Sequence, residues 1–478
     1  MTEFAKLTGL VLALTMSTTV IAADTHPMPL QGIPQAAPLS IPPSVNVGEQ
    51  LKAGYQAMVD KKYEQALDIY KPLAEQGDKI AQFQLGYLYQ TGLGLPSKDE
   101  QLAVAWYLKS SQQAFPPAQY ELATMYFYGV SVPKALDQAV TMYRQSAMEN
   151  YSLAQYMMGI IYSEGITVGK NLQQAASWFD KASSQGVLPA QYNLGLLYYN
   201  GEGIPADLIK AFSLFTSSAN DGFAKSQALL GSVYAAGLKG VPVDKVQALK
   251  WYTLAAKQGL AIAQYNLGVM YYNGWGTPID SKQAMSWLTQ ASAQNYPRAD
   301  FLLGYLAQTG VGPAKNPQHA LEWYTKAAEE GFAEAQFAVA YMYYNGDGIP
   351  KDPVKAYQWY LTAAKQGLAK AQYMVATLSQ KGQGVEADPQ AAITWFTAAA
   401  KQGMDTAQLA LGTIYANKLA YKEAYIWLDL ASTSSNTQIR NTAIKSRDSL
   451  VAHMKPEDIA DAKRQAKDYH DKYATQVS

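Results

Sequence analysis

Few side chains in this sequence of 478 residues have the types and spacing that catalysis or metal binding requires. The absence of cysteine excludes disulfides, thiolate zinc sites and cysteine nucleophiles. The four histidines, His26, His319, His453 and His470, are far apart along the chain and make no local metal-binding motif. Basic and acidic side chains balance at 38 each, so no net charge favours a nucleic acid or an anionic membrane. We therefore predict that the protein is not an enzyme and uses no metal, cofactor or nucleic acid.

Acidic and amide side chains recur at one place in the sequence, but their context favours helix capping over chemistry. Asp and Asn side chains accept hydrogen bonds from the free N–H groups at the start of a helix. Proline follows directly at Pro317, Pro353 and Pro389, as expected for the first helical position. The recurring residues are Asp99, Asn171, Asp207, Asp244, Asp280, Asn316, Asp352 and Asp388.

Gly-x-Gly triplets also recur, and they do not predict a phosphate-binding loop. None directly joins a strand to a helix, and no Gly-Lys-Ser/Thr follows them. Glycine tolerates positive φ, so the triplets instead predict left-handed C-caps of helices and the turns beyond. They are Gly201-Glu202-Gly203, Gly274-Trp275-Gly276, Gly310-Val311-Gly312, Gly346-Asp347-Gly348 and Gly382-Gln383-Gly384.

A repeat of 36 or 37 residues positions all of these groups. Each unit reads as two helices, of which the first covers about 13 positions and the second contains Ala-x-x-Trp-Tyr-x-x-Ala-Ala. Glycine recurs at the sixth position, where it costs about 1 kcal/mol of helix propensity against Ala. That recurrence predicts close approach by another helix. The units start at Ala81, Ala118, Ala154, Ala190, Ser226, Ala263, Ala299, Ala335, Ala371 and Ala407.

Aromatic side chains on the first helix of each unit are the candidates for binding a partner. Tyr or Phe recurs at positions 3, 7 and 10, which share one face, and these residue types are enriched at interface hot spots. Position 3 has an alternative interpretation as packing between helices. Position 10 varies from Gln90 to Phe127 to Ser163, which favours an exposed surface. The predicted partner-binding residues are Tyr265, Tyr272, Asn273, Phe301, Tyr305, Phe337, Tyr341, Tyr344 and Asn345.

The unit resembles the Sel-like repeat, a relative of the tetratricopeptide repeat. The resemblance is carried by Ala-Gln-x-x-Leu-Gly-x-x-Tyr, the Gly-x-Gly loop and Ala-x-x-Trp-Tyr-x-x-Ala-Ala-x-x-Gly, over about residues 81–432. Residues 49–80 look like a shorter unit, and two further helices are expected near 437–453 and 456–474. The resemblance implies an all-α, right-handed α/α solenoid of about eleven helix pairs with C-terminal capping helices. The unit from Ala407 departs from the pattern, because about four loop residues are missing.

The N-terminus has the pattern of a secretory signal peptide. Lys6 precedes an apolar stretch from Leu7 to about Ile21, and cleavage before Ala23 or Asp24 fits the small residues there. Six prolines then predict an extended linker. The expected organisation is a signal peptide over 1–22, the linker over 23–44, the solenoid over 45–432 and capping helices over 433–478.

These features predict an exported scaffold that binds a partner protein or peptide in a concave groove. The resemblance implies interaction with proteins and carries over no enzymatic residue. It also leaves two alternatives open. One is a factor that binds a host protein of the secretory immunoglobulin type, as a branch of long secreted Sel-like chains does. The other is a regulator of envelope or cell-wall enzymes. The expected location is the periplasm or the medium, with no membrane segment after cleavage.

Overall fold

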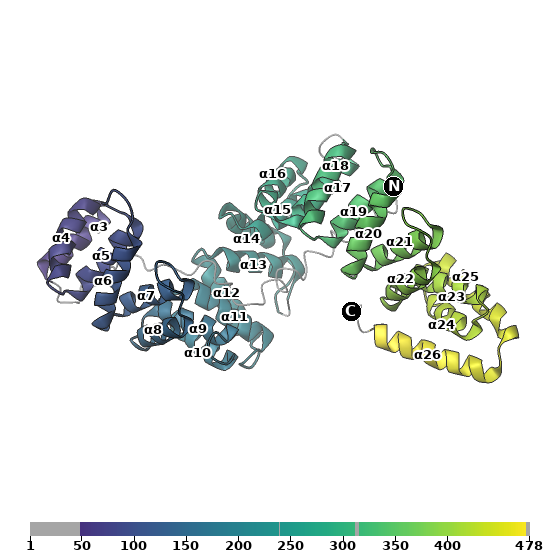
Figure 1. The fold of residues 1–478 in the computed structure, drawn as a ribbon, viewed down its shortest axis with the longest axis horizontal. Helices are drawn as coiled ribbons and strands as arrows, with labels where there is room; N and C mark the ends of the chain where they lie inside the picture. The colour runs from purple at the N-terminus through teal and green to yellow at the C-terminus, as the bar shows by residue number, and fades with distance from the viewer. Residues whose placement is uncertain (1–47, 239, 311–314, 475–478) are drawn as a thin grey trace. The chain divides into compact units, whose positions relative to one another are not determined.

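The computed structural model describes residues 48–238, 240–310 and 315–474, and within these ranges the chain is helical apart from its loops (Figure 1). An isolated bridge between Leu238 and Val241 is the one β-type pairing among the described residues. The described chain divides into two compact units, Met1–Ala263 and Gln264–Ser478. The predicted signal peptide and linker lie outside the described residues. No described helix is long and apolar enough to cross a membrane.

The helices come in antiparallel pairs, as the repeat predicts, and we call the members of a pair helix A and helix B. In the first unit the pairs are α3(Glu49–Val59)/α4(Tyr63–Glu75), α5(Lys79–Thr91)/α6(Glu100–Gln112), α7(Pro116–Tyr128)/α8(Leu136–Met148), α9(Ser152–Glu164)/α10(Leu172–Ser184), α11(Leu188–Asn200)/α12(Leu208–Asn220) and α13(Ala224–Ala236)/α14(Lys245–Lys257). The second unit begins inside α15. Its pairs are α15(Ala261–Asn273)/α16(Ser281–Ser292), α17(Pro297–Thr309)/α18(Pro317–Glu329), α19(Ala333–Asn345)/α20(Pro353–Lys365), α21(Ala369–Lys381)/α22(Pro389–Lys401) and α23(Asp405–Asn417)/α24(Tyr421–Ala431). The expected eleven pairs are therefore confirmed.

The caps predicted from the sequence set the ends of these helices. Each recurring Asp or Asn precedes a helix B and accepts a hydrogen bond from a backbone N–H of its first turn. The side chain of Asp352, for example, accepts from the N–H of Lys355 at 3.0 Å. These carboxylates are exposed or half-buried at helix starts, so capping accounts for their recurrence.

Glycine at position 6 of helix A lies against the side chain of its helix B partner. A Cβ built on Gly159 would lie 2.4 Å from the ring of Phe179, and one on Gly304 would lie 2.7 Å from the ring of Tyr324. The prediction of a close helix approach is confirmed. Large side chains of helix B are thus buried directly against the glycine backbone in these pairs.

The second glycine of a Gly-x-Gly triplet has a role beyond the predicted turn. Gly382 ends α21 with a left-handed φ of 65°, as a C-cap should. Gly384 also has positive φ, and a Cβ on it would lie 2.0 Å from the carbonyl oxygen of Pro353 in the preceding pair. The loop of one pair therefore rests on the first turn of helix B in the pair before it.

Buried glutamines also join several pairs to the pair that precedes them. The Nε2 of Gln372, at position 2 of helix A, donates to the carbonyl oxygen of Ala364 at 3.2 Å. Its Oε1 accepts from Nε2 of Gln402, at the end of the following helix B, at 2.8 Å. Gln402 donates as well to the carbonyl oxygen of Gly367 at 2.9 Å. We call this arrangement the glutamine ladder. Its Gln–Gln bonds join Gln82 to Gln113, Gln155 to Gln185, Gln227 to Gln258, Gln264 to Gln294, Gln336 to Gln366 and Gln372 to Gln402, at 2.7–2.8 Å.

An ion pair replaces one rung of the ladder in the pair α17/α18. Position 2 is Asp300, whose side chain is 0% exposed, and its Oδ1 accepts from Nζ of Lys326 at 3.0 Å. The hydroxyl of Ser292 donates to the same carboxylate at 2.5 Å. Lys326 also donates to the Ser292 carbonyl oxygen at 2.9 Å, the kind of acceptor that glutamine uses elsewhere. Charge-assisted bonds thus substitute for an amide contact at this junction.

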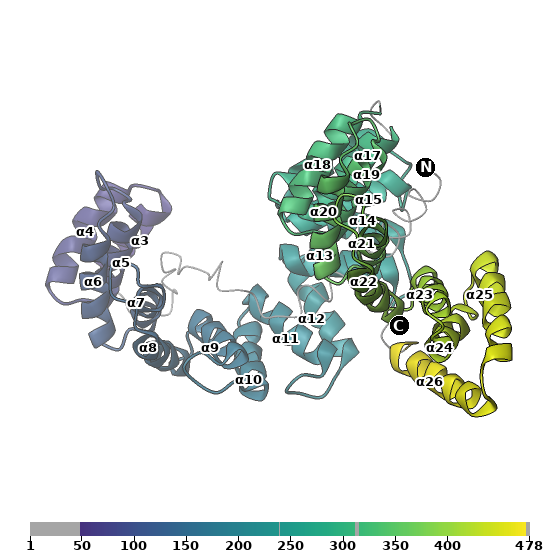
Figure 2. The ribbon, with the colours of Figure 1, turned by 45° about the vertical axis from the view of Figure 1, so that its right-hand side comes forward.

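Two helices follow the last pair, where the sequence predicts them. They are α25(Thr437–Leu450), continued by a 3-10 turn over Val451–His453, and α26(Pro456–Ala474). Both pack against α24, and they lie together beside α23 and α24 in Figure 2. Their polar outer surface suits the end of an open solenoid.

Candidate functional site

Position 3 of helix A forms an interior row of rings. Tyr120 packs edge-on against Tyr143 of its helix B and Tyr151 of the next turn, with ring centroids 5.6 and 5.4 Å apart. Phe301 packs edge-on against Phe332 and at a tilt against Tyr324, with ring centroids 5.4 and 5.3 Å apart. The alternative interpretation of position 3, packing between helices, is therefore correct where these side chains are buried.

This packing removes three residues from the predicted partner surface. Tyr265, Phe301 and Tyr305 are only 4%, 5% and 8% exposed. Their side chains are almost completely buried, so the expectation of an exposed aromatic side chain is wrong for them. The other predicted residues remain accessible to some degree: Tyr272, Asn273, Phe337, Tyr341 and Tyr344 are half-buried and Asn345 is exposed.

Variation at positions 7 and 10 has a structural cause in several pairs. The Gln90 Oε1 accepts from the hydroxyl of Tyr107 at 2.6 Å, and the Gln308 Oε1 accepts from Tyr324 at 3.0 Å. Thr124 at position 7 bonds the hydroxyl of Tyr143 at 2.8 Å. Polar side chains at these positions therefore satisfy buried tyrosines of helix B, so variation there does not by itself indicate a surface.

Tyr272 of α15 and Tyr305 of α17 lie close to one another where two neighbouring pairs of the second unit meet. Burial, with the nearby Tyr305 hydroxyl, raises the pKa of Tyr272 to about 12. We expect tyrosinate absorbance from Tyr272 to appear near pH 12, well above the ordinary pKa of about 10. The difference between alkaline titrations of the parent and of Tyr272→Phe measures it. A Tyr272 signal that rises near pH 10 would contradict this placement.

Four aromatic side chains gather on α19. Phe337 packs on Tyr360 of α20 with ring centroids 5.2 Å apart, while Tyr341 and Tyr344 flank the same core. The hydroxyl of Tyr360 is buried without a hydrogen-bond partner. At the end of α19, Asn345 donates from Nδ2 to the Tyr341 carbonyl oxygen at 3.1 Å. Asn273 donates from Nδ2 to the Val269 carbonyl oxygen in the same way. The NH₂ group of each of these two asparagines is therefore engaged within its own helix.

A buried carboxylate in the first unit was not anticipated from the sequence. Glu121 of α7 is 2% exposed and lies among tyrosines of neighbouring helices. Burial is the larger cause that raises the pKa of Tyr87 and Tyr151, and the nearby Glu121 carboxylate raises it further. Position 4 carries Gln84 and Asn193 in other pairs, so a polar side chain recurs there, and that recurrence was the available signal. No group of three His, Asp or Glu side chains suited to a metal ion occurs within the described ranges.

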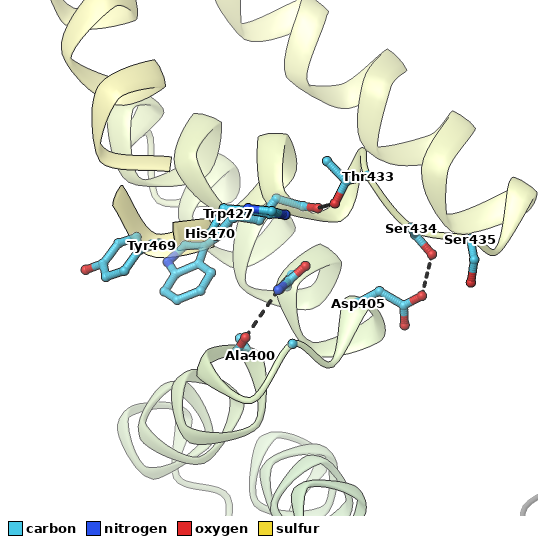
Figure 3. A pocket seen from close by; sticks show the side chains of 11 residues that line it. Ala400, Asp405, Trp427, Thr433, Ser434, Ser435, Tyr469 and His470 are labelled. Carbon is cyan, nitrogen blue, oxygen red and sulfur yellow. Dashed lines mark hydrogen bonds between the residues drawn. The ribbon is translucent and has the colours of Figure 1, made fainter. Parts of the chain in front are cut away.

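A cavity of about 290 Å³ lies where the last pair meets α26 (Figure 3). The ring of Trp427 stacks on Tyr469 with centroids 5.6 Å apart and planes 16° apart. Asp405 accepts from the hydroxyl of Ser434 across another side of the cavity. The remaining lining residues are Ala400, Gly403, Gln408, Leu430, Thr433, Ser435 and His470.

The Sel1 repeat family model matches ten successive segments: 50–78, 79–115, 116–151, 152–187, 188–223, 224–260, 261–296, 297–332, 333–368 and 369–404. The chain belongs to the Sel1 repeat family. The resemblance predicted from the repeat is therefore confirmed. The eleventh Sel1-like pair, α23/α24, lies beyond the matched segments, in keeping with its shortened loop.

Two solved Sel1 repeat structures are similar along most of this chain. One is a protective antigen present in uropathogenic Escherichia coli strains that displays the SLR fold. It is 30% identical, with 86% of this chain and 96% of its own chain covered and a TM-score of 0.56. The other, a Sel1 repeat protein from Oxalobacter formigenes, is 26% identical, with 83% and 99% covered and a TM-score of 0.51. The comparison with curated proteins finds no match.

Proposed function

We propose that this Sel1 repeat protein is an exported scaffold that binds a partner protein through the aromatic face of α19. One observation carries the proposal. Phe337, Tyr341 and Tyr344 are half-buried, whereas the aromatic rings at positions 3 and 7 of α17 are buried. Half-exposed aromatic side chains on a rigid helix offer a large contact area at low entropic cost. Tyr272 and Asn273 on α15, two pairs earlier, are further half-buried residues at the corresponding positions.

Export rests on the sequence of the N-terminus. The signal-peptide pattern over 1–22 and the proline-rich segment over 23–44 favour secretion and a tether. The similar protein of uropathogenic Escherichia coli is a protective antigen, which supports a host-facing role as the first alternative. Regulation of envelope or cell-wall enzymes is the second alternative, and it requires that the mature protein stays in the periplasm.

Photo-crosslinking in the native cell tests the partner surface. A photoreactive phenylalanine analogue replaces Tyr344, and in a matched control it replaces Gln358, which is exposed on α20. We expect the analogue at 344 to crosslink one partner protein and the analogue at 358 to crosslink none. Tyr341→Ala with Tyr344→Ala should weaken that partner's binding by at least tenfold, because each truncated hot-spot residue costs about 1–2 kcal/mol.

The compartment of the crosslinked species separates the alternatives. A crosslinked product in the periplasmic fraction favours an envelope partner, provided that the mass of the protein shows an N-terminus at Ala23 or Asp24. A product formed only after host secretion is added to secreted protein favours the host-binding alternative. Equal crosslinking from positions 344 and 358 would show that the aromatic face is not the binding surface.

A further inference from the structure

The glutamine ladder ends without its last rung. In the pair α21/α22, Gln402 donates to both the Oε1 of Gln372 and the carbonyl oxygen of Gly367. The same two acceptors recur one pair later, as Oε1 of Gln408 and the carbonyl oxygen of Gly403. Gln408 still donates to the Ala400 carbonyl oxygen at 3.2 Å, so its position within the ladder is retained. No described residue donates a hydrogen bond to either acceptor.

The missing donor follows from the sequence of the eleventh pair. Its loop is about four residues shorter, so the residue that corresponds to Gln402 is Ser434. Serine is too short to reach Gln408, and its hydroxyl donates to Asp405 instead. The space that a glutamine side chain fills elsewhere belongs here to the cavity of about 290 Å³ (Figure 3).

Other interrupted rungs differ from this one. The residues that correspond to Gln402 after Gln119 and Gln191 are Glu149 and Asp221, which have no amide group, and the Oε1 atoms of Gln119 and Gln191 are buried without a partner. Gln408, in contrast, lines a cavity that a ligand can enter. An acceptor without a protein donor that lines such a cavity favours a ligand with a complementary donor.

Three other polar side chains of the cavity are already hydrogen-bonded within the protein. Asp405 is engaged through both oxygens, since its Oδ1 accepts from the N–H of Thr406 at 2.7 Å. The hydroxyl of Thr433 donates to the Leu430 carbonyl oxygen at 2.8 Å. The stacked rings of Trp427 and Tyr469 supply an apolar wall beside these groups. A ligand that fits therefore brings two N–H donors on a short apolar stem.

We propose that this cavity binds a primary carboxamide, and that its occupant is a glutamine side chain of a polypeptide docking at the C-terminal end of the solenoid. The two hydrogens of one NH₂ group satisfy Gln408 and Gly403 together, as the Gln402 amide does for Gln372 and Gly367. The methylene groups of the glutamine lie along Trp427. This site is separate from the aromatic face of α19, and neither proposal depends on the other.

The test uses full-length mature protein labelled with fluorotryptophan, with the Trp427 resonance assigned from Trp427→Phe. The probes are the blocked peptides Gly-Gln-Gly and Gly-Glu-Gly, and propionamide as a free carboxamide. We expect Gly-Gln-Gly to shift the Trp427 resonance saturably at millimolar concentration and to bind at least tenfold more tightly than Gly-Glu-Gly, because the carboxylate has no donor for the two acceptors. Tighter binding of propionamide than of the peptide would contradict the polypeptide source.

Three variants test whether binding depends on the missing glutamine contact. Ser434→Gln supplies the missing side chain, so it should abolish the shift, whereas Ser434→Ala keeps the cavity and should preserve it. Gln408→Met removes the acceptor and should also abolish binding, which covers the case that Ser434→Gln does not fold. Equal binding of both peptides, an unchanged shift in folded Ser434→Gln, or no saturable shift at tens of millimolar would overturn the proposal.

Discussion

Gly384→Ala is expected to lower the free energy of unfolding by about 3 kcal/mol, and to do so through two separate effects. The left-handed backbone at Gly384, with φ of 74°, costs any residue with a Cβ about 1–2 kcal/mol. The new methyl group would also lie 2.0 Å from the carbonyl oxygen of Pro353, and overpacking of this kind costs about 1–3 kcal/mol. Urea unfolding with hydrogen exchange of α20–α22 measures the loss and its location.

Gly382→Ala in the same loop is the matched control. Gly382 has a similar φ of 65°, but the nearest atom to its new Cβ is the Ala387 side chain at 3.2 Å. We therefore expect a loss of only about 1 kcal/mol, from the backbone conformation alone. Equal losses in the two variants would show that the loop does not rest on the preceding pair.

Lys326→Met is expected to destabilise the junction between α16 and α17 by about 3 kcal/mol. It leaves the Asp300 carboxylate buried without its cation, and removing one partner of a buried pair costs about 3–5 kcal/mol. We expect the lower end of this energy range because the Lys326 side chain is 38% exposed, so water reaches part of the site. Lys98→Met, at an exposed pair with Glu100, should cost less than about 1 kcal/mol in the same urea experiment.

Restoring the ladder at this junction should remove the dependence on Lys326. In the variant Asp300→Gln with Glu330→Gln, position 2 and the end of helix B carry the glutamines found in the other pairs. Lys326→Met should then change the free energy of unfolding by less than about 1 kcal/mol, as expected when no buried charge is left unpaired. A loss of about 3 kcal/mol in this background too would assign the effect to packing of the lysine stem.

The features that could be predicted from the sequence are those with partners nearby along the chain. Asp352 caps a helix that begins at the next residue, and Gly304 lies against Tyr324 of its own pair, so a repeated spacing was enough. The contact of Gly384 with Pro353 and the bond between Gln372 and Gln402 join residues about 30 apart. Periodicity shows that such residues recur, but it does not show which of them meet.

The candidate surface was harder to predict for a related reason. A helix in a solenoid is covered by its own partner and by both neighbours, so only a narrow strip stays accessible. Helical periodicity placed Tyr305 of α17 and Tyr341 of α19 on the same face of their respective helices. Tyr305 is nevertheless only 8% exposed, whereas Tyr341 is half-buried. The side chains on adjacent pairs decide that difference.

The Ser292, Asp300 and Lys326 cluster makes the order of the pairs chemically specific. A pair joined by glutamine can follow any neighbour that offers a backbone carbonyl, so such pairs are interchangeable blocks. The pair α17/α18 instead requires a hydroxyl from the pair before it, which Ser292 provides where several other pairs carry alanine. Moving this block behind a pair that carries alanine there would leave the buried carboxylate without its hydroxyl donor. One charged junction thus limits the places that its block can take in a chain of otherwise exchangeable parts.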